Sequence, residues 1–211
     1  VCPGPVDVAG RVPAGWLEAW RDARPTSVRT PTAKEAACAS VWRAHVDPQS
    51  PALVIGASEA VRAFDRWAVP GPVSPLVIAN RGLGGIDGTM ATATGVWAAL
   101  HRPVRVVVGD LTAAHDGLGL LRGVDEPDPD VQVVVLADHG GAIFAGLEHA
   151  GAEPSLFHRY FLTPQQLDLS ALARAVGAGH RRVGVGEELD EALARPIRGR
   201  SYLEVALPEL G

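Results

Sequence analysis

Two acidic turns hold the residues of this sequence that are best suited to chemistry. Asp110 follows a valine-rich run at 104–108, and Asp138 follows a second run at 131–135. Such β-branched runs predict buried strands of a parallel sheet, and open α/β sheets bind ligands where their strands end. Two carboxylates at strand ends, 28 positions apart and beside glycines, suit a hard divalent cation that holds a diphosphate.

Each turn also has a plainer interpretation when it is taken alone. Asp110 lies between a predicted strand and a predicted helix, where aspartate is a common N-cap, and Asp138 could be an ordinary turn residue. The backbone N–H groups of Leu111 and Thr112 would attract an anion that Asp110 repels, unless a cation lies between them. Because the glycines after Asp138 let a main-chain carbonyl face the same cation, the two turns together favour a metal–diphosphate site.

A glycine-dense loop at 80–88 precedes the next predicted helix. Four of its nine residues are glycine, which is more than a turn requires. Arg81 stands at the end of the preceding strand and suits a carboxylate or a phosphate. Ile86 is an apolar residue beside a polar site, and simple packing would also explain it. The spacing Gly82-x-Gly84 does not continue as a dinucleotide-binding fingerprint, because the third glycine is misplaced.

Strand and helix patterns alternate along the rest of the sequence. Strands are expected at 52–55, 76–79, 104–108, 131–136, 182–185 and 202–206. Helices are expected at 32–45, 59–67, 89–100, 112–122, 170–176 and 187–194. This alternation predicts an α/β fold with three layers, in which helices cover both faces of a parallel sheet. The segment 142–166 has no clear pattern.

The composition excludes several classes of partner. The chain has 211 residues, 47% of them hydrophobic, and a formal net charge of −5. It can therefore bury a core, and it lacks the basic surface that nucleic acid or an anionic membrane requires. No apolar run of about 18 residues suggests an integral membrane segment. Cys2 and Cys38 form no disulfide framework or metal-ligand spacing, which favours a reducing, cytoplasmic setting.

The start of the chain differs from the rest in pattern. Residues 1–45 are expected to be a linker tail from a preceding domain, and residues 46–211 the folded domain. Trp16, Leu17 and Trp20 would share one face of a short helix. Because nothing nearby in the sequence could cover this face, we expect it to dock on a partner domain of a longer protein.

The acidic turns also carry a resemblance to a known enzyme family. Gly109-Asp110, followed by Asp138-His139-Gly140-Gly141, is similar to the GD…NN signature of thiamine-diphosphate enzymes. The segments ANRGLGGIDGTMATATG, VVGDLTAAHDGLGLL, VVVLADHGGAIF and FLTPQQLDL resemble the family of 2-succinyl-5-enolpyruvyl-6-hydroxy-3-cyclohexene-1-carboxylate synthase, an enzyme of the menaquinone pathway. Leu111 stands where most thiamine-diphosphate enzymes have glycine, which points to this branch. The resemblance implies a thiamine-diphosphate-binding fold and the C-terminal domain of that synthase.

The resemblance implies a role for each matching residue. Asp110, Asp138 and the carbonyl of Gly140 would bind Mg²⁺ or Mn²⁺, and Ile86 would be the wedge that bends the cofactor. The other residues implied to contact thiamine diphosphate are Gly109, Leu111, Thr112 and Gly141. The positions implied to bind substrate carboxylates or to wall the catalytic pocket are Ser58, Arg62, Arg81, Phe144 and Leu147. The implied substrates are 2-oxoglutarate, which is decarboxylated, and isochorismate, which receives the succinyl-semialdehyde unit. Both are anions that arginine suits.

The sequence departs from the family in two respects. Asparagines are usual around the second turn, where this chain has Ala137, Asp138 and His139, so the added negative charge of Asp138 must be offset. Family members are also longer: an N-terminal domain binds the pyrimidine of the cofactor and carries an activating glutamate, and a middle domain follows it. The resemblance implies these domains as partners, a homodimer or homotetramer as the full enzyme, and no turnover by this piece alone.

Three alternatives stay open at this point. A decarboxylase of the acetohydroxyacid synthase type would bind the same cofactor but would not need both Arg62 and Arg81 in its pocket. A noncatalytic module with a degenerate site would account for Ala137 and His139. A metal-dependent phosphohydrolase could use the two aspartates, although such sites commonly add histidine ligands that this pattern lacks.

Overall fold

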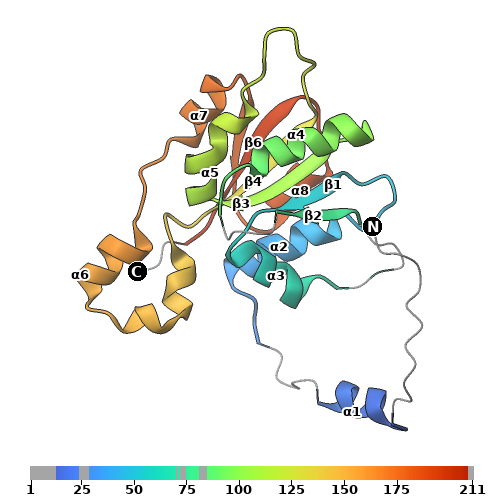
Figure 1. Cartoon of the computed structure of the whole chain (residues 1–211), viewed down its shortest axis with the longest axis vertical. Coiled ribbons are helices and arrows are strands. Elements are labelled where there is room, and N and C mark those ends of the chain that lie inside the picture. The colour runs from blue at the N-terminus through green and yellow to red at the C-terminus, as the bar shows by residue number, and fades with distance from the viewer. Residues whose placement is uncertain (1–12, 24–28, 70, 72–74, 81–84, 209–211) are drawn as a thin grey trace. The chain divides into compact units, whose positions relative to one another are not determined.

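The chain forms two compact units, residues 1–30 and residues 31–211. The computed structural model describes residues 13–23, 29–69, 71, 75–80 and 85–208. The smaller unit contains helix α1 (Trp16–Asp22), on which the exposed rings of Trp16 and Trp20 lie 5.8 Å apart, centroid to centroid. The larger unit contains all the other helices and strands labelled in Figure 1.

Helix α2 (Ala33–Arg43) belongs to the larger unit, which corrects the predicted domain boundary. Its side chains Ala37, Cys38 and Val41 are fully buried and belong to the core. The compact unit therefore begins at Pro31, well before the predicted boundary between residues 45 and 46. The physical reason is that these three side chains recur at helical spacing and give α2 an apolar face to bury.

One sheet of six parallel strands forms the centre of the larger unit and confirms the predicted α/β fold. In spatial order, the strands are β2 (Val77–Ala79), β1 (Ala52–Ile55), β3 (Val104–Gly109), β4 (Val131–Ala137), β6 (Arg200–Ala206) and β5 (Gly179–Val183). The central strands β1, β3 and β4 are buried along almost their whole length. Strands covered on both faces need apolar residues at nearly every position, which is why β1 reads as the apolar run ALVI and β3 and β4 read as valine-rich runs.

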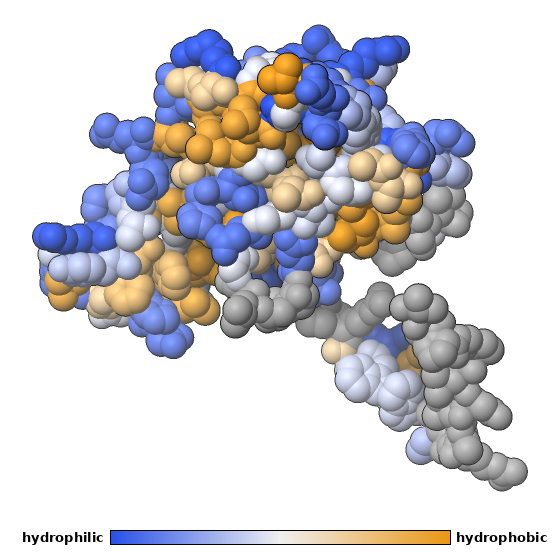
Figure 2. All heavy atoms as spheres, turned by 45° about the horizontal axis from the view of Figure 1, so that its top comes forward, coloured by the Kyte–Doolittle hydropathy of each residue, from blue (hydrophilic) through white to orange (hydrophobic). Residues whose placement is uncertain are grey.

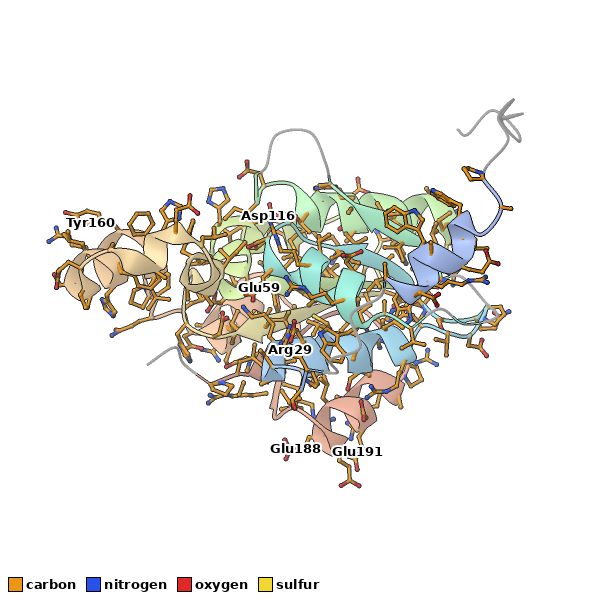
Figure 3. The ribbon with its side chains drawn as sticks, turned by 90° about the horizontal axis from the view of Figure 1, so that it is seen from below. Arg29, Glu59, Asp116, Tyr160, Glu188 and Glu191 are labelled. Atoms are coloured by element: carbon orange, nitrogen blue, oxygen red, sulfur yellow. The ribbon has the colours of Figure 1, made fainter. Side chains whose placement is uncertain are left out.

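Helices cover both faces of the sheet and complete the three predicted layers (Figure 1). The helices of one core cluster are α2, α3 (Glu59–Trp67) and α8 (Glu187–Ala194). The helices of the other cluster are α4 (Thr89–Leu100), α5 (Asp110–Asp116) and α7 (Leu169–Ala175). Figure 3 shows α2 and α8 side by side, with Glu188 and Glu191 pointing outward from α8. Within the described residues, no helix has the length and apolarity needed to cross a membrane.

The chain leaves the neighbouring strands β1 and β3 in opposite directions. From β1 it passes through α3, on one face, to β2 at one side of the sheet. From β3 it passes through α5, on the other face, to β4 at the opposite side. Such a switch point opens a crevice at the carboxyl ends of the two strands, which is where α/β sheets bind ligands.

Three regions differ from the predicted elements. The helix expected at 112–122 is α5 followed by the 3₁₀ turn η1 (Gly117–Leu120), and Gly117 at this junction packs so closely that a Cβ atom there would lie 2.6 Å from the side chain of Leu172. The strand expected at 182–185 begins at Gly179 and ends at Val183, because its pairing with β6 sets its bounds. The unpatterned segment contains the short turns η2 (Ala142–Gly146), η3 (Glu148–Gly151), α6 (Pro154–Phe157) and η4 (His158–Leu162).

Candidate functional site

A pocket of about 560 Å³ lies at the carboxyl ends of the central strands, and we call it the strand-end pocket. The predicted residues in its lining are Ser58, Arg62, Ile86, Gly109, Asp110, Leu111, Thr112, Asp138, Gly140, Gly141 and Phe144. Leu147 is not in the lining, and its side chain is 43% exposed. Arg81 lies outside the described residues. The structure thus brings together most of the predicted site at the switch point of the sheet.

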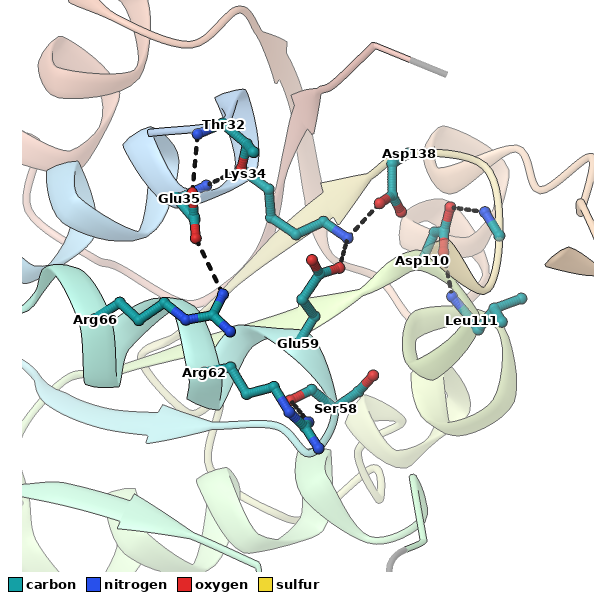
Figure 4. Close-up of polar contacts among 11 residues, drawn as sticks. Thr32, Lys34, Glu35, Ser58, Glu59, Arg62, Arg66, Asp110, Leu111 and Asp138 are labelled. Atoms are coloured by element: carbon teal, nitrogen blue, oxygen red, sulfur yellow. Dashed lines mark hydrogen bonds and ion pairs between the residues drawn. The ribbon is translucent and has the colours of Figure 1, made fainter. Parts of the chain in front are cut away.

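The carboxylate of Asp110 joins the two acidic turns. One oxygen, Oδ1, accepts a hydrogen bond from the Leu111 N–H (2.7 Å), and Oδ2 accepts one from the Gly140 N–H (3.0 Å; Figure 4). The Leu111 N–H, which was expected to face the diphosphate, therefore bonds to Asp110 here. Burial and then the charge of Asp138 raise the pKa of Asp110, although backbone N–H groups partly oppose this. Two carboxylates that repel each other in this way would be stabilised by a cation.

Lys34 is the main feature of the pocket that the sequence analysis missed. Its ammonium forms ion pairs with Asp138 Oδ2 and with Glu59 Oε2, the latter at 2.7 Å (Figure 4). The side chains of Lys34 and Asp138 are only 14% and 7% exposed. Burial raises the pKa of Asp138, and Lys34 partly lowers it again. Lys34 supplies the positive charge that Asp138 was predicted to need.

The lysine stays charged because its partners outweigh its burial. Burial by itself would lower the pKa of Lys34, but the ion pairs with Asp138 and Glu59 raise it above its ordinary value. The ammonium is therefore present at neutral pH, and together with Arg62 it gives the pocket lining two cations beside three carboxylates.

A capping box places Lys34 at the pocket. The Thr32 hydroxyl accepts from the Glu35 N–H (3.3 Å), and the Glu35 carboxylate accepts from the Thr32 N–H (2.9 Å). The other carboxylate oxygen of Glu35 pairs with Arg66 of α3 at 3.3 Å. The motif Thr32-x-x-Glu35 is readable in the sequence as a helix start. Nothing local, however, indicates that this helix end reaches the ends of β3 and β4.

Two non-glycine residues beside the carboxylates adopt strained backbone conformations. Ser58, just before Glu59, has φ 85°, and His139, just after Asp138, has φ 64°. Such conformations cost about 1–3 kcal/mol each and are concentrated at binding and active sites. The carbonyl of Ser58 accepts a hydrogen bond from Arg62 Nη1 (2.9 Å), so Arg62 lies back against the start of its own helix. The turns are thus held in shape by the surrounding fold.

The loop that carries Ile86 is tied to the end of α5. Asp116 accepts hydrogen bonds from the N–H groups of Gly88 (3.0 Å) and Met90 (2.8 Å), and it thereby caps helix α4 from outside. His115 also pairs with Asp87. These contacts hold Ile86, which is half-buried, in the lining of the pocket.

The second acidic turn packs tightly against the end of the segment 142–162. Gly140 has φ 147°, and a Cβ atom there would lie 2.3 Å from the carbonyl oxygen of Leu162. The N–H of Gly141 donates to the same oxygen at 2.6 Å. Phe144 lines the pocket and packs against Phe161, with 5.8 Å between ring centroids. Only glycine at position 140 permits this close approach.

The donor set fits a divalent cation that is shared with a diphosphate. Asp110 and Asp138 are 8% and 6% exposed, and both offer hard oxygen atoms to one pocket. Among the described residues, no group of three or more His, Cys, Asp or Glu side chains could hold a metal ion. Mg²⁺ is commonly bound by only one or two carboxylates, with phosphate oxygens and water completing its octahedron. The pocket therefore has what a metal–diphosphate site needs from the protein.

A parallel sheet with paired carboxylates at its switch point is the arrangement of the class of α/β domains that bind a phosphorylated cofactor at the ends of their strands. The chain belongs to the family described as "Thiamine pyrophosphate enzyme, C-terminal TPP binding domain", whose model matches residues 60–205. This match covers most of the larger unit and identifies thiamine diphosphate as the cofactor of the class.

The relatives of the chain within this class are synthases. It is 41% identical to the 2-succinyl-5-enolpyruvyl-6-hydroxy-3-cyclohexene-1-carboxylate synthase of Paenarthrobacter aurescens (strain TC1), over 99% of this chain and 39% of that protein. It is 49% identical to the synthase of the same name from Renibacterium salmoninarum, over 72% of this chain and 28% of that protein. These likenesses confirm the predicted resemblance. The chain spans well under half the length of these curated relatives.

A solved structure confirms the fold independently. Benzoylformate decarboxylase from Polynucleobacter necessarius superposes on 87% of this chain with a TM-score of 0.64, at 21% sequence identity, and the match covers 34% of that protein. The thiamine-diphosphate-binding fold that the resemblance implied is therefore the fold of this domain.

Proposed function

We propose that the chain is the diphosphate-binding domain of a thiamine-diphosphate-dependent synthase of menaquinone biosynthesis. One observation carries the proposal: Asp110 and Asp138, two buried carboxylates that repel each other, line a single pocket at the switch point of the sheet. In the proposal these carboxylates and the Gly140 carbonyl hold Mg²⁺ or Mn²⁺, and the metal holds the diphosphate. Thr112 and Gly141 lie beside the diphosphate, and Ile86 packs against the cofactor.

The proposed reaction decarboxylates 2-oxoglutarate and adds the succinyl-semialdehyde unit to isochorismate. Bound thiamine diphosphate supplies the electron sink for the decarboxylation. This chain contributes substrate contacts: Arg62 and Arg81 bind carboxylates, with Ser58 beside them. Phe144 gives the pocket an apolar wall. The names of the relatives support this assignment, as does Arg62 in the lining of the strand-end pocket.

The proposed enzyme needs further domains. We infer that a pyrimidine-binding domain and a middle domain complete the site, that the full enzyme is a homodimer or homotetramer, and that this chain alone has no turnover. The greater length of the relatives supports this inference. Figure 2 shows apolar residues on the surface of the segment around α6, where Leu147, Leu156 and Tyr160 are exposed. Leu147 in this proposal contacts a neighbouring domain.

Calorimetric titration of thiamine diphosphate, with and without Mg²⁺, tests the metal–diphosphate site. We expect Mg²⁺-dependent binding to the chain, with at least about a 100-fold loss of affinity in Asp110→Asn, because a metal ligand with a full charge is replaced by a neutral amide. Asp190→Asn is the matched control, since Asp190 of α8 pairs with Arg43 of α2 and lies outside the pocket lining. Binding that is independent of Mg²⁺, or equal in both variants, would contradict the assigned site.

The substrate assignment needs the polypeptide that unites this domain with the two domains the proposal requires. There, Arg62→Ala and Arg81→Ala should raise the KM for the anionic substrates while thiamine diphosphate binding stays unchanged. A decarboxylase of the acetohydroxyacid synthase type would not need both arginines in its pocket, so it would tolerate at least one of the two changes.

A noncatalytic module is the second candidate, and the ion pair between Lys34 and Asp138 favours it, since it uses one oxygen of a proposed metal ligand. This candidate predicts no binding of Mg²⁺ and thiamine diphosphate, either by the chain or by the complete polypeptide.

A further inference from the structure

The strand-end pocket contains a cation of its own. The ammonium of Lys34 contacts Asp138 Oδ2 and lies 2.7 Å from Glu59 Oε2, while Asp110 lies close enough to Asp138 for their charges to interact. Figure 4 shows the lysine reaching from the first turn of α2 toward the ends of β3 and β4. The ammonium therefore sits beside one of the two carboxylates that the proposed function gives to the metal.

Helix stability does not explain a lysine at this position. Lys34 is the second residue of α2, where the positive end of the helix dipole favours acidic side chains. Its side chain is also 14% exposed, so the ammonium is largely removed from water. A buried cation at the unfavourable end of a helix is accounted for by its two carboxylate partners, and both of them line the pocket.

The charge of Lys34 acts with opposite sign on the two proposed ligands of the pocket. Its ammonium repels a divalent cation at Asp110 and Asp138 and competes with it for an oxygen of Asp138. The same ammonium attracts the diphosphate, because without it the metal-loaded pocket would be one unit more negative. Arg62 also lines the pocket, but its contribution is the same whether or not Lys34 is present.

We propose that Lys34 weakens the binding of the metal ion to this site and strengthens the binding of the diphosphate. This inference rests on the proposed function, since it assumes that both ligands bind at Asp110 and Asp138. Lys34 is thereby a binding residue of the diphosphate site, contributed by a segment that precedes the first strand of the sheet.

The test measures the two affinities separately in the chain. Binding of Mn²⁺ alone is followed by the loss of its free-ion electron paramagnetic resonance signal, and thiamine diphosphate is then titrated at saturating Mn²⁺. In Lys34→Met we expect Mn²⁺ to bind about fivefold more tightly and thiamine diphosphate about fivefold more weakly, as one nearby unit charge in a partly solvated pocket predicts. A lysine with only a structural role would weaken both when it is lost.

Two further variants separate charge from structure. Glu59→Gln makes the pocket one unit more positive and should do the reverse of Lys34→Met, while keeping Lys34 and altering a side chain that is already 36% exposed. The double variant Lys34→Met/Glu59→Gln restores the charge of the pocket and should bring both affinities within about twofold of the original chain. Arg43→Met is the matched control, because Arg43, also on α2, pairs with Asp190 outside the pocket lining, and it should change neither affinity.

The outcomes distinguish this inference from the proposed function. Absence of Mn²⁺ binding, or Mn²⁺ binding that survives Asp110→Asn, overturns the proposed function and the role of Lys34 with it. Mn²⁺ binding that depends on Asp110, combined with shifts of the same sign or no shift in Lys34→Met and Glu59→Gln, leaves the proposed function standing and overturns the role of Lys34.

Discussion

The parallel sheet has a carboxyl edge, where its strands end, and an amino edge, where its strands begin. These two edges bury ionisable side chains in different ways. At the carboxyl edge, Asp110 and Asp138 repel each other in a pocket. At the amino edge, Arg105 near the start of β3 is 1% exposed. Its guanidinium donates from Nε to Gln132 Oε1 and from Nη2 to the Leu193 carbonyl, both at 2.8 Å. Like charges meet beside Lys34 at the first edge, whereas the buried charge of Arg105 at the second donates to two neutral acceptors.

The comparison shows that burial of a charge, or the size of a hollow, does not by itself indicate a binding site. The hollow at the amino edge, beside Arg105, has a volume of about 610 Å³, which is comparable to that of the strand-end pocket. Its buried groups nevertheless connect elements of the fold to one another. The carboxyl edge differs because strained turns at Ser58 and His139 hold repelling carboxylates in place, an arrangement that costs stability and that the proposed metal ion would relieve.

The largest effect is expected where the carboxyl edge depends on backbone geometry. In Gly140→Ala the new Cβ would meet the Leu162 carbonyl oxygen at 2.3 Å, at φ 147°. We expect a loss of about 3–4 kcal/mol in the free energy of unfolding, from backbone strain and overpacking together. Urea denaturation measures it. Gly146→Ala is the control, since nothing lies within 4 Å of its added Cβ. Equal stability of the two variants would show that the second turn is not rigid.

At the amino edge, Arg105→Met should lower stability without altering the pocket. The variant leaves Gln132 Oε1 and the Leu193 carbonyl without their donor, and we expect a loss of about 2–3 kcal/mol. Mn²⁺ binding should stay unchanged. Arg182→Met is the control: Arg182 is 63% exposed and its partner Glu204 keeps a second partner in His180, so its loss should cost under about 1 kcal/mol. A change in Mn²⁺ affinity in Arg105→Met would contradict the division of roles between the two edges.

The fold and most of the pocket were predictable because they depend on local patterns. Continuous valine-rich runs indicated β3 and β4, and a residue directly after a parallel strand necessarily lies at the carboxyl edge. Asp110 and Asp138 were therefore placed together correctly. The predicted helix at 112–122 was too long, since α5 gives way at Gly117 to the turn η1, where Gly117 packs against Leu172, far away in the sequence.

Lys34 and Leu147 show where local patterns stop being informative. Lys34 reaches the pocket only because Glu35 ties the first turn of α2 to Arg66 of α3, which is a contact 31 positions away in the sequence. Leu147 follows Phe144 within a segment of short turns, where no regular period relates sequence position to direction. Both outcomes were decided by tertiary contacts rather than by propensity.

The two edges should also respond oppositely to acid. Burial lowers the pKa of His45 to about 4, and its Nδ1–H donates to the Val41 carbonyl at 2.6 Å. The unfolded chain takes up a proton at this histidine near its ordinary pKa of 6.5, whereas the folded chain does not until about pH 4. Stability from His45 is therefore present above pH 6.5 and is lost as the pH falls toward 4.

At the carboxyl edge, the dependence of stability on pH has the opposite sign. The pKa values of Asp110 and Asp138 are raised above 3.8, so their repulsion is relieved as the pH falls through the raised values. We expect His45→Asn to lose about 2 kcal/mol less than the original chain between pH 7 and pH 5, measured by urea denaturation. Asp110→Asn should change the pH dependence of the free energy of unfolding in the opposite direction. Parallel pH profiles for the original chain and His45→Asn would show that His45 is not kept neutral by burial.

The smallest effect is expected at Asp116, which lies near the carboxyl edge but resembles Arg105 in its contacts. Its two oxygens accept from the N–H groups of Gly88 and Met90 at the start of α4. Asp116→Ala should cost about 1 kcal/mol, as the loss of a helix cap does, and Asp116→Asn, which keeps one acceptor oxygen, about half of that. Urea denaturation of the two variants measures the difference in their free energies of unfolding.

Asp116 also tests whether contacts or position decide the role of a charge. Because it holds the loop of Ile86 and is not in the pocket lining, its loss should weaken thiamine diphosphate binding only about twofold and leave Mn²⁺ affinity unchanged. If Asp116→Ala instead altered Mn²⁺ affinity as strongly as Lys34→Met, nearness to the carboxyl edge alone would set the electrostatics of the site. An effect confined to stability and to the loop would mean that a carboxylate acts on the metal only when it faces the pocket.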